Sequence, residues 1–397
     1  MRNIIYICTL LFLGACASTT QTHLDNVQKD FANANFETTD KNIADQSNLD
    51  LLINGTALFH DNNYQASDLT FEEFNKRNLN ETSSSILRES AGLLLGGGVN
   101  SYKPYMMDSL FVSYYQIWDL LALQDWSNAR VVINQSYNRQ QNMSIEYQKL
   151  IEKNKDKISE NSQYSELVNK NITDWAAFSD IMNPALMYLS GIYFLNDADF
   201  DNAITYLKRA NGMMPENTFI KQDLDLAQKR IKPKNITWQF IETGFAPRLR
   251  EKNSGLFLPN IGMVYFSISE PYLNDNFTQP NGSQLLADVD AMFITEYREY
   301  QINEAIRAFT SAASKTTMQA TMYNSHDKSA SLLGILSSIY TVASSNTDVR
   351  TWATLPKYIY VSRNENNLKN ENNLIYTRII NGKITDNKTI NLKKSKE

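Results

Sequence analysis

Hydrophobic positions in the first half of the chain recur at helical spacing, in three segments that share one layout. Each segment opens with a small or apolar residue, reaches an aromatic residue nine positions later, and continues in steps of three, four and three. Residues three and four positions apart lie on one face of an α-helix, so each run predicts an amphipathic helix. The positions are Gly55, Tyr64, Ser67, Phe71 and Phe74, then Ile117, Trp126, Ala129, Ile133 and Ser136, and finally Gly191, Phe200, Ala203, Leu207 and Ala210.

A polar turn before each aromatic residue indicates a second helix upstream, so each segment predicts two antiparallel helices. A small residue in the first helix lets the second helix approach closely, and the aromatic residue fills the space beside it. We therefore expect Trp126 and Phe200 to be buried and Gly191 to contact the following helix. The alternative is a set of unrelated amphipathic helical hairpins with similar spacing.

The third segment resembles the tetratricopeptide repeat, in which helical pairs stack into an array. The segments start 62 and 74 residues apart (117−55 and 191−117), whereas that repeat is about 34 residues long. Further helices must therefore lie between them, and one is expected over Glu81–Leu95. We expect residues 49–232 to form the repeat domain. The positions that match the repeat best are Gly191, Phe194, Phe200, Ala203, Leu207, Ala210 and Pro215.

The stretch Gln140–Asn169 is highly charged and has sparse apolar positions. It is expected to be a projecting hairpin or a long exposed helix. Its charges belong either to a solvated face or to a surface that binds a partner.

The pattern changes after residue 232, where apolar and polar residues begin to alternate as they do in strands. Residues Asn381-Gly382 between two apolar runs predict a hairpin with a type I′ turn. We expect a mostly α protein, in which a tetratricopeptide-like helical repeat array is followed by a smaller α+β domain at 233–392 and a loose tail at 393–397. The predicted strands are Trp238–Thr243, Met263–Ser269, Tyr358–Ser362 and Leu374–Ile380 with Lys383–Ile384, and the predicted helices are Leu285–Lys315 and Ser329–Ala343.

The amino terminus has the layout of a secretory signal peptide over residues 1–15, with a positive start at Arg2 and an apolar run over Ile4–Leu13. The residues before Cys16, Leu-Gly-Ala, resemble the lipobox of bacterial lipoproteins. That resemblance implies palmitate and other acyl chains on Cys16. Because Ala17 follows rather than Asp, it also implies an anchor in the outer membrane, facing the periplasm. The polar residues 16–48 are expected to be a flexible tether.

Composition argues against several kinds of function. The formal net charge is −5, and no basic patch could follow a phosphate backbone, so we expect no nucleic-acid partner. Of the two cysteines, Cys8 leaves with the signal peptide and Cys16 carries the lipid, so no thiol is left for catalysis or a disulfide. The three histidines have no metal-ligand spacing, and His60 is expected to be exposed in a turn. We therefore expect no metal, no other cofactor and no enzyme.

Three further segments resemble an uncharacterised family of bacterial lipoproteins that pair a repeat region with an α+β domain. They are Tyr114–Arg130, Glu242–Pro247 and Asp348–Pro356. The resemblance implies a fold and a place in the cell envelope, with a link to cell-wall synthesis, but no activity.

Tyrosines of the repeat region are the candidate contacts for a protein partner. One end of a tyrosine packs while the other meets water, so tyrosine often anchors interfaces. We expect Tyr114, Tyr115, Tyr137 and Tyr193 to be exposed in this role. Alternatively, they pack between neighbouring helices.

Two residues of the C-terminal part, Arg350 and Trp352, are candidates for a groove that binds a glycan or a peptide. Alternatively, Trp352 packs in the core and Arg350 pairs with a carboxylate. Glu242 is either a surface carboxylate or an inward anchor. The sequence thus favours an interaction scaffold of the envelope that binds a protein through its repeat groove. The alternative is a module that binds or modifies the cell wall, with peptidoglycan as its partner, through the C-terminal domain.

Overall fold

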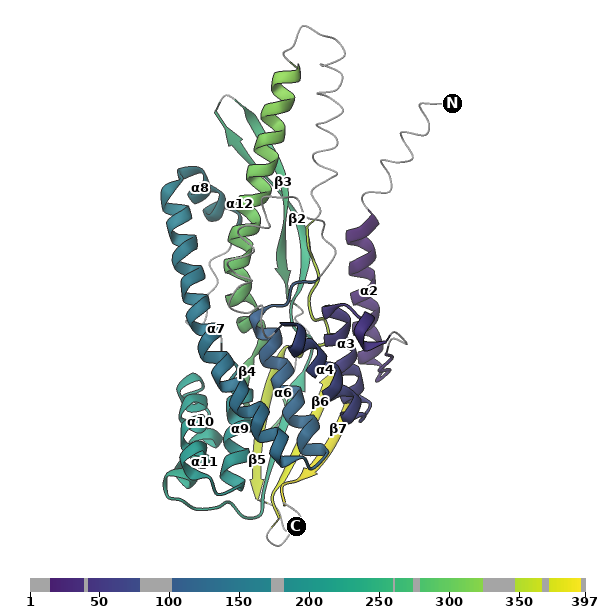
Figure 1. Cartoon of the computed structure of the whole chain (residues 1–397), viewed down its shortest axis with the longest axis vertical. Coiled ribbons are helices and arrows are strands. Elements are labelled where there is room, and N and C mark those ends of the chain that lie inside the picture. Colours follow the sequence, from purple (N-terminus) through teal and green to yellow (C-terminus); the bar gives the residue numbers. More distant parts are fainter. Residues whose placement is uncertain are drawn as a thin grey trace.

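The computed structural model describes residues 15–38, 42–78, 102–172, 182–259, 261–273, 279–323, 347–365 and 371–393 (Figure 1). The expected signal peptide up to residue 14, the expected helices Glu81–Leu95 and Ser329–Ala343, His326 and residues 394–397 lie outside these ranges. The helices are α2 (Ala15–Ala32), a 3-10 turn η1 (Ile43–Asp45), α3 (Asn48–His60), α4 (Tyr64–Asn78), α6 (Met106–Ala122), α7 (Trp126–Glu160), α8 (Ser162–Asn171), α9 (Pro184–Asn196), α10 (Phe200–Met213), α11 (Thr218–Gln228) and α12 (Val289–Tyr323). The strands are β1 (Ile236–Thr243), β2 (Arg248–Leu258), β3 (Gly262–Tyr272), β4 (Gln284–Asp288), β5 (Tyr358–Glu365), β6 (Asn373–Ile380) and β7 (Lys383–Asn391).

The three sequence segments form three helical hairpins, α3–α4, α6–α7 and α9–α10, and their turns are alike. Each first helix ends in a Schellman motif, in which the residue two positions before the second helix is left-handed. These residues are Asn62, Gln124 and Ala198, with φ of 63°, 61° and 59°. The N–H of the next residue donates to a carbonyl of the first helix, from Asn63 to Leu58, Asp125 to Leu120 and Asp199 to Phe194, over 2.9, 2.8 and 3.0 Å.

The close approach expected at the small residues is confirmed. A Cβ atom added to Gly191 would lie 2.6 Å from Leu207 on the second helix, and one added to Gly55 would lie 2.5 Å from Phe71. The expectation that Trp126 and Phe200 are buried is wrong, because both are only half-buried. They stand at the first position of the second helix, where the turn leaves one side open to water.

The C-terminal part contributes a five-stranded sheet in the order β4-β5-β1-β6-β7. Strands β1 and β6 pair in parallel, and the other neighbours are antiparallel. The β6–β7 hairpin turns at Asn381 and Gly382, both with positive φ, as a type I′ turn requires. The predicted start of the long helix at Leu285 is wrong, because Gln284–Asp288 is the edge strand β4 and α12 begins at Val289. Pairing with β5 overrides the helical pattern there.

The sheet packs against the first helices of the three hairpins. Phe59 of α3 meets Tyr376 with ring centroids 4.9 Å apart, and Trp118 of α6 meets Phe240 at 5.4 Å. Tyr188 of α9 meets Phe240 at 5.9 Å. One hydrophobic core therefore runs from the hairpins into the sheet, across residue 232.

A second, smaller core holds together a projecting part that we call the arm (Figure 1). The arm consists of the far part of α7, with α8, α12 and the two-stranded sheet β2–β3. The expected long helix is present as α7, which runs over 35 residues. One face of α7 is covered by α12. The Tyr147 hydroxyl donates to the Thr295 carbonyl (2.7 Å), and the Asn154 side chain donates to the Glu299 carboxylate (2.7 Å).

The expected flexible tether is wrong for the described part of residues 16–48. These residues form α2 and η1, and α2 packs on the fold with Leu24 and Phe31 buried. The Gln28 amide donates to the Ala353 carbonyl (2.9 Å), and Asp25 pairs with Arg248. The apolar residues Leu24, Val27 and Phe31 follow helical spacing within a polar stretch, which is the signal that the polar composition obscured.

Candidate functional site

The tyrosines expected to be exposed lie mostly inside the protein. Tyr114 and Tyr115 are fully buried on α6, and the Tyr115 hydroxyl donates to Glu242 of β1 over 3.1 Å. Tyr193 is buried and donates to the Trp126 carbonyl (2.7 Å). The expectation of exposed anchors is therefore wrong for these three, because the sheet covers α6, which carries Tyr114 and Tyr115, and Tyr193 packs against Trp126 of α7.

Tyr137, the fourth of these tyrosines, lies on α7 and is half-buried. Its ring meets Tyr206 with centroids 5.3 Å apart, and the Arg209 guanidinium lies 4.2 Å above it. It packs between neighbouring helices, as the alternative interpretation held, and it is not an exposed anchor.

Arg350 and Trp352 also have the structural roles that were given as the alternative to a binding groove. The Trp352 indole is 2% exposed and donates to the Thr56 hydroxyl over 2.9 Å. The Arg350 guanidinium pairs with Asp348 through two contacts of 2.8 and 2.6 Å. Trp352 therefore packs in the core and Arg350 pairs with a carboxylate, as the alternative interpretation held.

Glu242 is an inward anchor at the centre of a buried polar cluster. Its Oε2 accepts from Arg378 (2.7 Å), from the Tyr376 hydroxyl (2.7 Å) and from Tyr115. Burial raises the pKa of Glu242 above its ordinary value, although the Arg378 charge acts to lower that pKa. Both members of the ion pair have no exposed surface, so the cluster joins β1 and β6 to α6 and offers no access to a substrate.

His60 is buried, so the expectation of an exposed turn histidine is wrong. Its Nδ1 lies 2.8 Å from Asp386, and its ring stacks on Phe36 with centroids 5.1 Å apart. Burial lowers the pKa of His60 to about 4, although Asp386 acts to raise it. The imidazole is therefore neutral at neutral pH and closed off from solvent.

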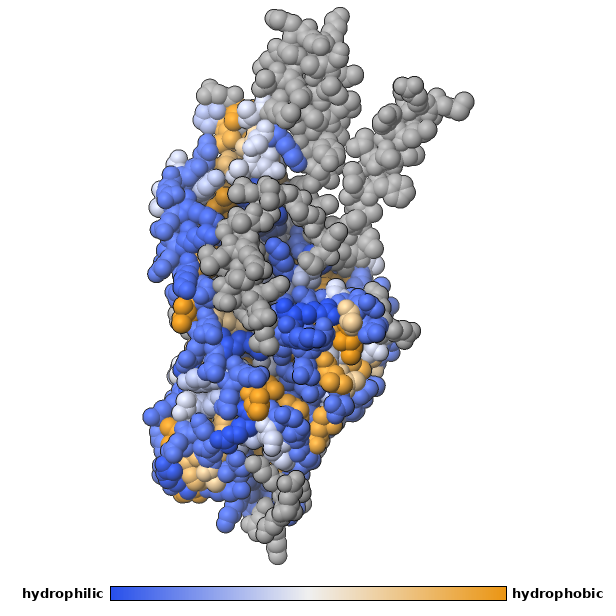
Figure 2. Space-filling model, in the orientation of Figure 1, coloured by the Kyte–Doolittle hydropathy of each residue, from blue (hydrophilic) through white to orange (hydrophobic). Residues whose placement is uncertain are grey.

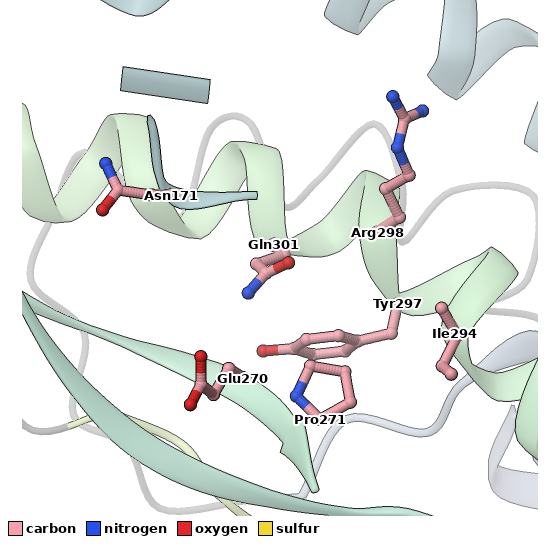
Figure 3. A pocket seen from close by; sticks show the side chains of 7 residues that line it. All are labelled: Asn171, Glu270, Pro271, Ile294, Tyr297, Arg298 and Gln301. Carbon is pink, nitrogen blue, oxygen red and sulfur yellow. The ribbon is translucent and has the colours of Figure 1, made fainter. Parts of the chain in front are cut away.

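A small pocket lies at the base of the arm, between α12 and β3 (Figure 3). Tyr297 and Gln301 point into it from α12, opposite Glu270 of β3. Gln301 donates to the Ser269 carbonyl over 2.8 Å, and burial raises the pKa of the neighbouring Glu304 to about 7. The cavity measures about 50 Å³, whereas ligand sites are commonly about 300–1,000 Å³. It has room for a few water molecules and not for a glycan or a peptide.

Several exposed apolar side chains lie on the described surface, and two of their locations concern binding. One is the hairpin β2–β3, where Phe257, Met263 and Tyr265 are 62%, 42% and 58% exposed. The other is the outer surface of the first two helical hairpins, with Leu69 on α4, Leu123 after α6 and Val131 on α7. Figure 2 shows hydrophobic groups near the free end of β2–β3 and others over α3, α4, α6 and α7. The sequence predicted a strand over Met263–Ser269, within β3, but no strand over Arg248–Leu258, so β2 and the exposed face that it shares with β3 were missed.

We found no match to the chain among protein-family models, curated proteins or solved structures. In the part of the chain that the structure describes, no group of three His, Cys, Asp or Glu side chains converges as a metal site would require. None of the described helices is both long and apolar enough to cross a membrane.

Proposed function

We propose that the protein is an interaction scaffold of the bacterial cell envelope, anchored in the outer membrane through lipid on Cys16 and facing the periplasm. It binds a protein partner through the outer surface of its tetratricopeptide-like helical hairpins, and it acts without catalysis. The lipid anchor and the outer-membrane location are supported by the residues around Cys16. A link between the partner and cell-wall synthesis is supported by the family resemblance.

The proposal is carried by the exposed apolar residues Leu69, Leu123 and Val131 on the outer surface of the hairpins. An array of helical repeats usually offers its partner a concave surface. In this protein the five-stranded sheet already fills that position, because α3, α6 and α9 pack on it. A partner must therefore use the second helices and the turns that lead into them, where Leu69 and Val131 on the helices and Leu123 in a turn meet solvent.

Crosslinking in cells tests the proposal. A photoreactive amino acid is placed at Leu69 or at Val131, and a matched control is placed at Ile384 of β7, which is also strongly exposed. We expect one protein adduct from both hairpin positions and none from the control. Adducts from neither hairpin position, or the same adducts from all three, would contradict the proposal. Membrane fractionation with labelled palmitate, compared with Cys16→Ser, tests the anchor separately.

A second candidate function, binding to the cell wall, is supported by the sheet face that points away from the helices. A row of hydrogen bonds crosses three strands there, since Gln239 donates to the Thr377 hydroxyl (2.9 Å) and Thr377 donates to Asn387 (2.9 Å). Thr377 is buried, but the amides of Gln239 and Asn387 reach the surface on either side of it, and amide groups suit the hydroxyl groups of a glycan. Cosedimentation with purified peptidoglycan tests this function, and Gln239→Ala with Asn387→Ala should abolish it.

A further inference from the structure

The free end of the β2–β3 hairpin is unusual in its composition. Residues 253–269 contain no charged side chain, although charged residues flank them at Lys252 and Glu270. We call the described residues 255–259 and 261–265 of this hairpin the tip. Phe257 pairs with Met263 and Gly255 pairs with Tyr265, so the exposed side chains share one face of the sheet. An apolar face at the end of a projecting element is costly in water unless another apolar phase covers it.

Gly255 allows this face to be flat. A Cβ atom at Gly255 would lie 3.1 Å from both Met263 and Tyr265, so the missing side chain leaves room for theirs to lie across β2. The opposite face of the hairpin is already used, because Leu256 and Val264 pack against α12 in the core of the arm. The exposed row is therefore held on a rigid support rather than on a loop.

Cations from α8 and β2 lie at the base of the tip. The Lys170 ammonium donates to the Gly255 carbonyl over 2.8 Å. Lys252 and Arg250 both pair with Glu270, at 2.9 and 2.7 Å, so this carboxylate is more than neutralised. Glu251 is an exposed acid next to them. An apolar end with phenylalanine and tyrosine next to lysine and arginine side chains matches the boundary of a phospholipid bilayer, where cations meet phosphates and aromatic rings lie among headgroups.

The tip and the anchor face the same way. Cys16 lies in the first turn of α2, and in Figure 1 the start of α2 and the free end of β2–β3 both point to the upper end of the molecule. A lipid on Cys16 would thus bring the tip to the membrane that already holds the chain. Once one attachment is made, the second is an intramolecular event and needs little apolar area.

We infer that the tip inserts into the headgroup region of the bilayer that holds the lipid on Cys16. This inference rests on the anchoring in the proposed function. The tip is then a second membrane contact, and it fixes how the helical hairpins are presented to the periplasm.

Depth-dependent fluorescence quenching tests the inference on the full lipidated protein in vesicles of phosphatidylethanolamine and phosphatidylglycerol. Because Cys16 is the only cysteine expected in the mature chain and is acylated, Tyr265→Cys gives a single site for an environment-sensitive dye. Ile384→Cys, which is 66% exposed on β7, is the matched control. Lipids with a nitroxide near the headgroup should remove most of the fluorescence at residue 265 and leave residue 384 unchanged. Adding Phe257→Asp to the reporter should restore most of the lost fluorescence.

The outcomes separate the inference from the proposed function. If the protein floats with the vesicles and the label at residue 265 is no more quenched than the control, the tip stays in water and the inference is wrong. Equal quenching at both positions also overturns it, because the contact would then be unspecific. If the protein does not float with the vesicles, the anchoring and the inference both fail. A photoreactive residue at Phe257 that captures a protein in cells, rather than lipid, assigns the tip to a protein partner and overturns the inference.

Discussion

The buried ion pair between Glu242 and Arg378 allows a sharp test of how the sheet is held against the hairpins. Arg378→Met removes the charge that faces Glu242 and the donors to the Gly244 and Thr354 carbonyls, which lie 2.7 and 3.2 Å away. Since both partners are fully buried, breaking the pair leaves an uncompensated carboxylate in the core. Such a loss costs about 3–5 kcal/mol of unfolding free energy, a large part of the total stability of a typical domain.

The loss should depend on pH in a defined direction. Burial already raises the pKa of Glu242 above its ordinary value, and removing Arg378 removes the main influence that lowers it. Glu242 then binds a proton more readily in the folded variant than in the unfolded chain. The stability of the variant therefore falls as pH rises from the pKa of Glu242 in the unfolded chain towards its higher pKa in the folded protein. Arg378→Met should therefore lose less stability at pH 5 than at pH 8.

Urea unfolding followed by tryptophan fluorescence measures the effect, because Trp118 and Trp238 lie in the same core. The double variant Glu242→Gln with Arg378→Met buries no charge and keeps an acceptor for the Tyr376 and Tyr115 hydroxyls. It should recover part of the loss, which a double-mutant cycle would quantify. A loss below about 1 kcal/mol for Arg378→Met, with an unchanged dependence on urea, would show that the pair is not desolvated and would refute the reasoning.

Two further predictions follow from close packing and from burial. Gly191→Ala should destabilise the protein by about 1–3 kcal/mol, because the added Cβ meets Leu207 at 2.6 Å. Gly212→Ala in α10, where nothing lies within 4 Å, should be neutral or stabilising, and equal losses in thermal unfolding would contradict this packing. The folded-state pKa of His60 is lowered from 6.5 to about 4, so the unfolded chain binds more protons between these values and stability should fall by roughly 3 kcal/mol as pH drops through that window. His60→Gln should remove this part of the pH dependence, and a wild-type slope in the variant would assign it to other groups.

The helical hairpins were predictable from sequence because their signal is local. Steps of three and four positions decide which face of a helix is buried, and Ser67, Ala129 and Ala203 are buried at corresponding positions of α4, α7 and α10. The strands β2 and β4 and the helix α2 were not predicted. The state of β4 and the packing of α2 on the fold depend on partners far away in the sequence. Gln284–Asp288 is a strand because β5 lies beside it, and α2 is ordered because Arg248 and the Ala353 carbonyl meet it.

The sequence of the first helices indicates that the sheet covers the concave side of the hairpins. All thirteen residues of α9 are buried, whereas α10 buries only one face. A helix that is apolar on every side must be covered on every side, so α9 needs α10 on one face and a second layer on the other. A repeat array that leaves its groove open for a partner has polar residues on the inner helices instead. Because α6 is also buried along its length, the tyrosines of that helix belong to the contact between the hairpins and the sheet. The surfaces that remain for interactions are the outer helices and the arm, where the next experiments should be directed.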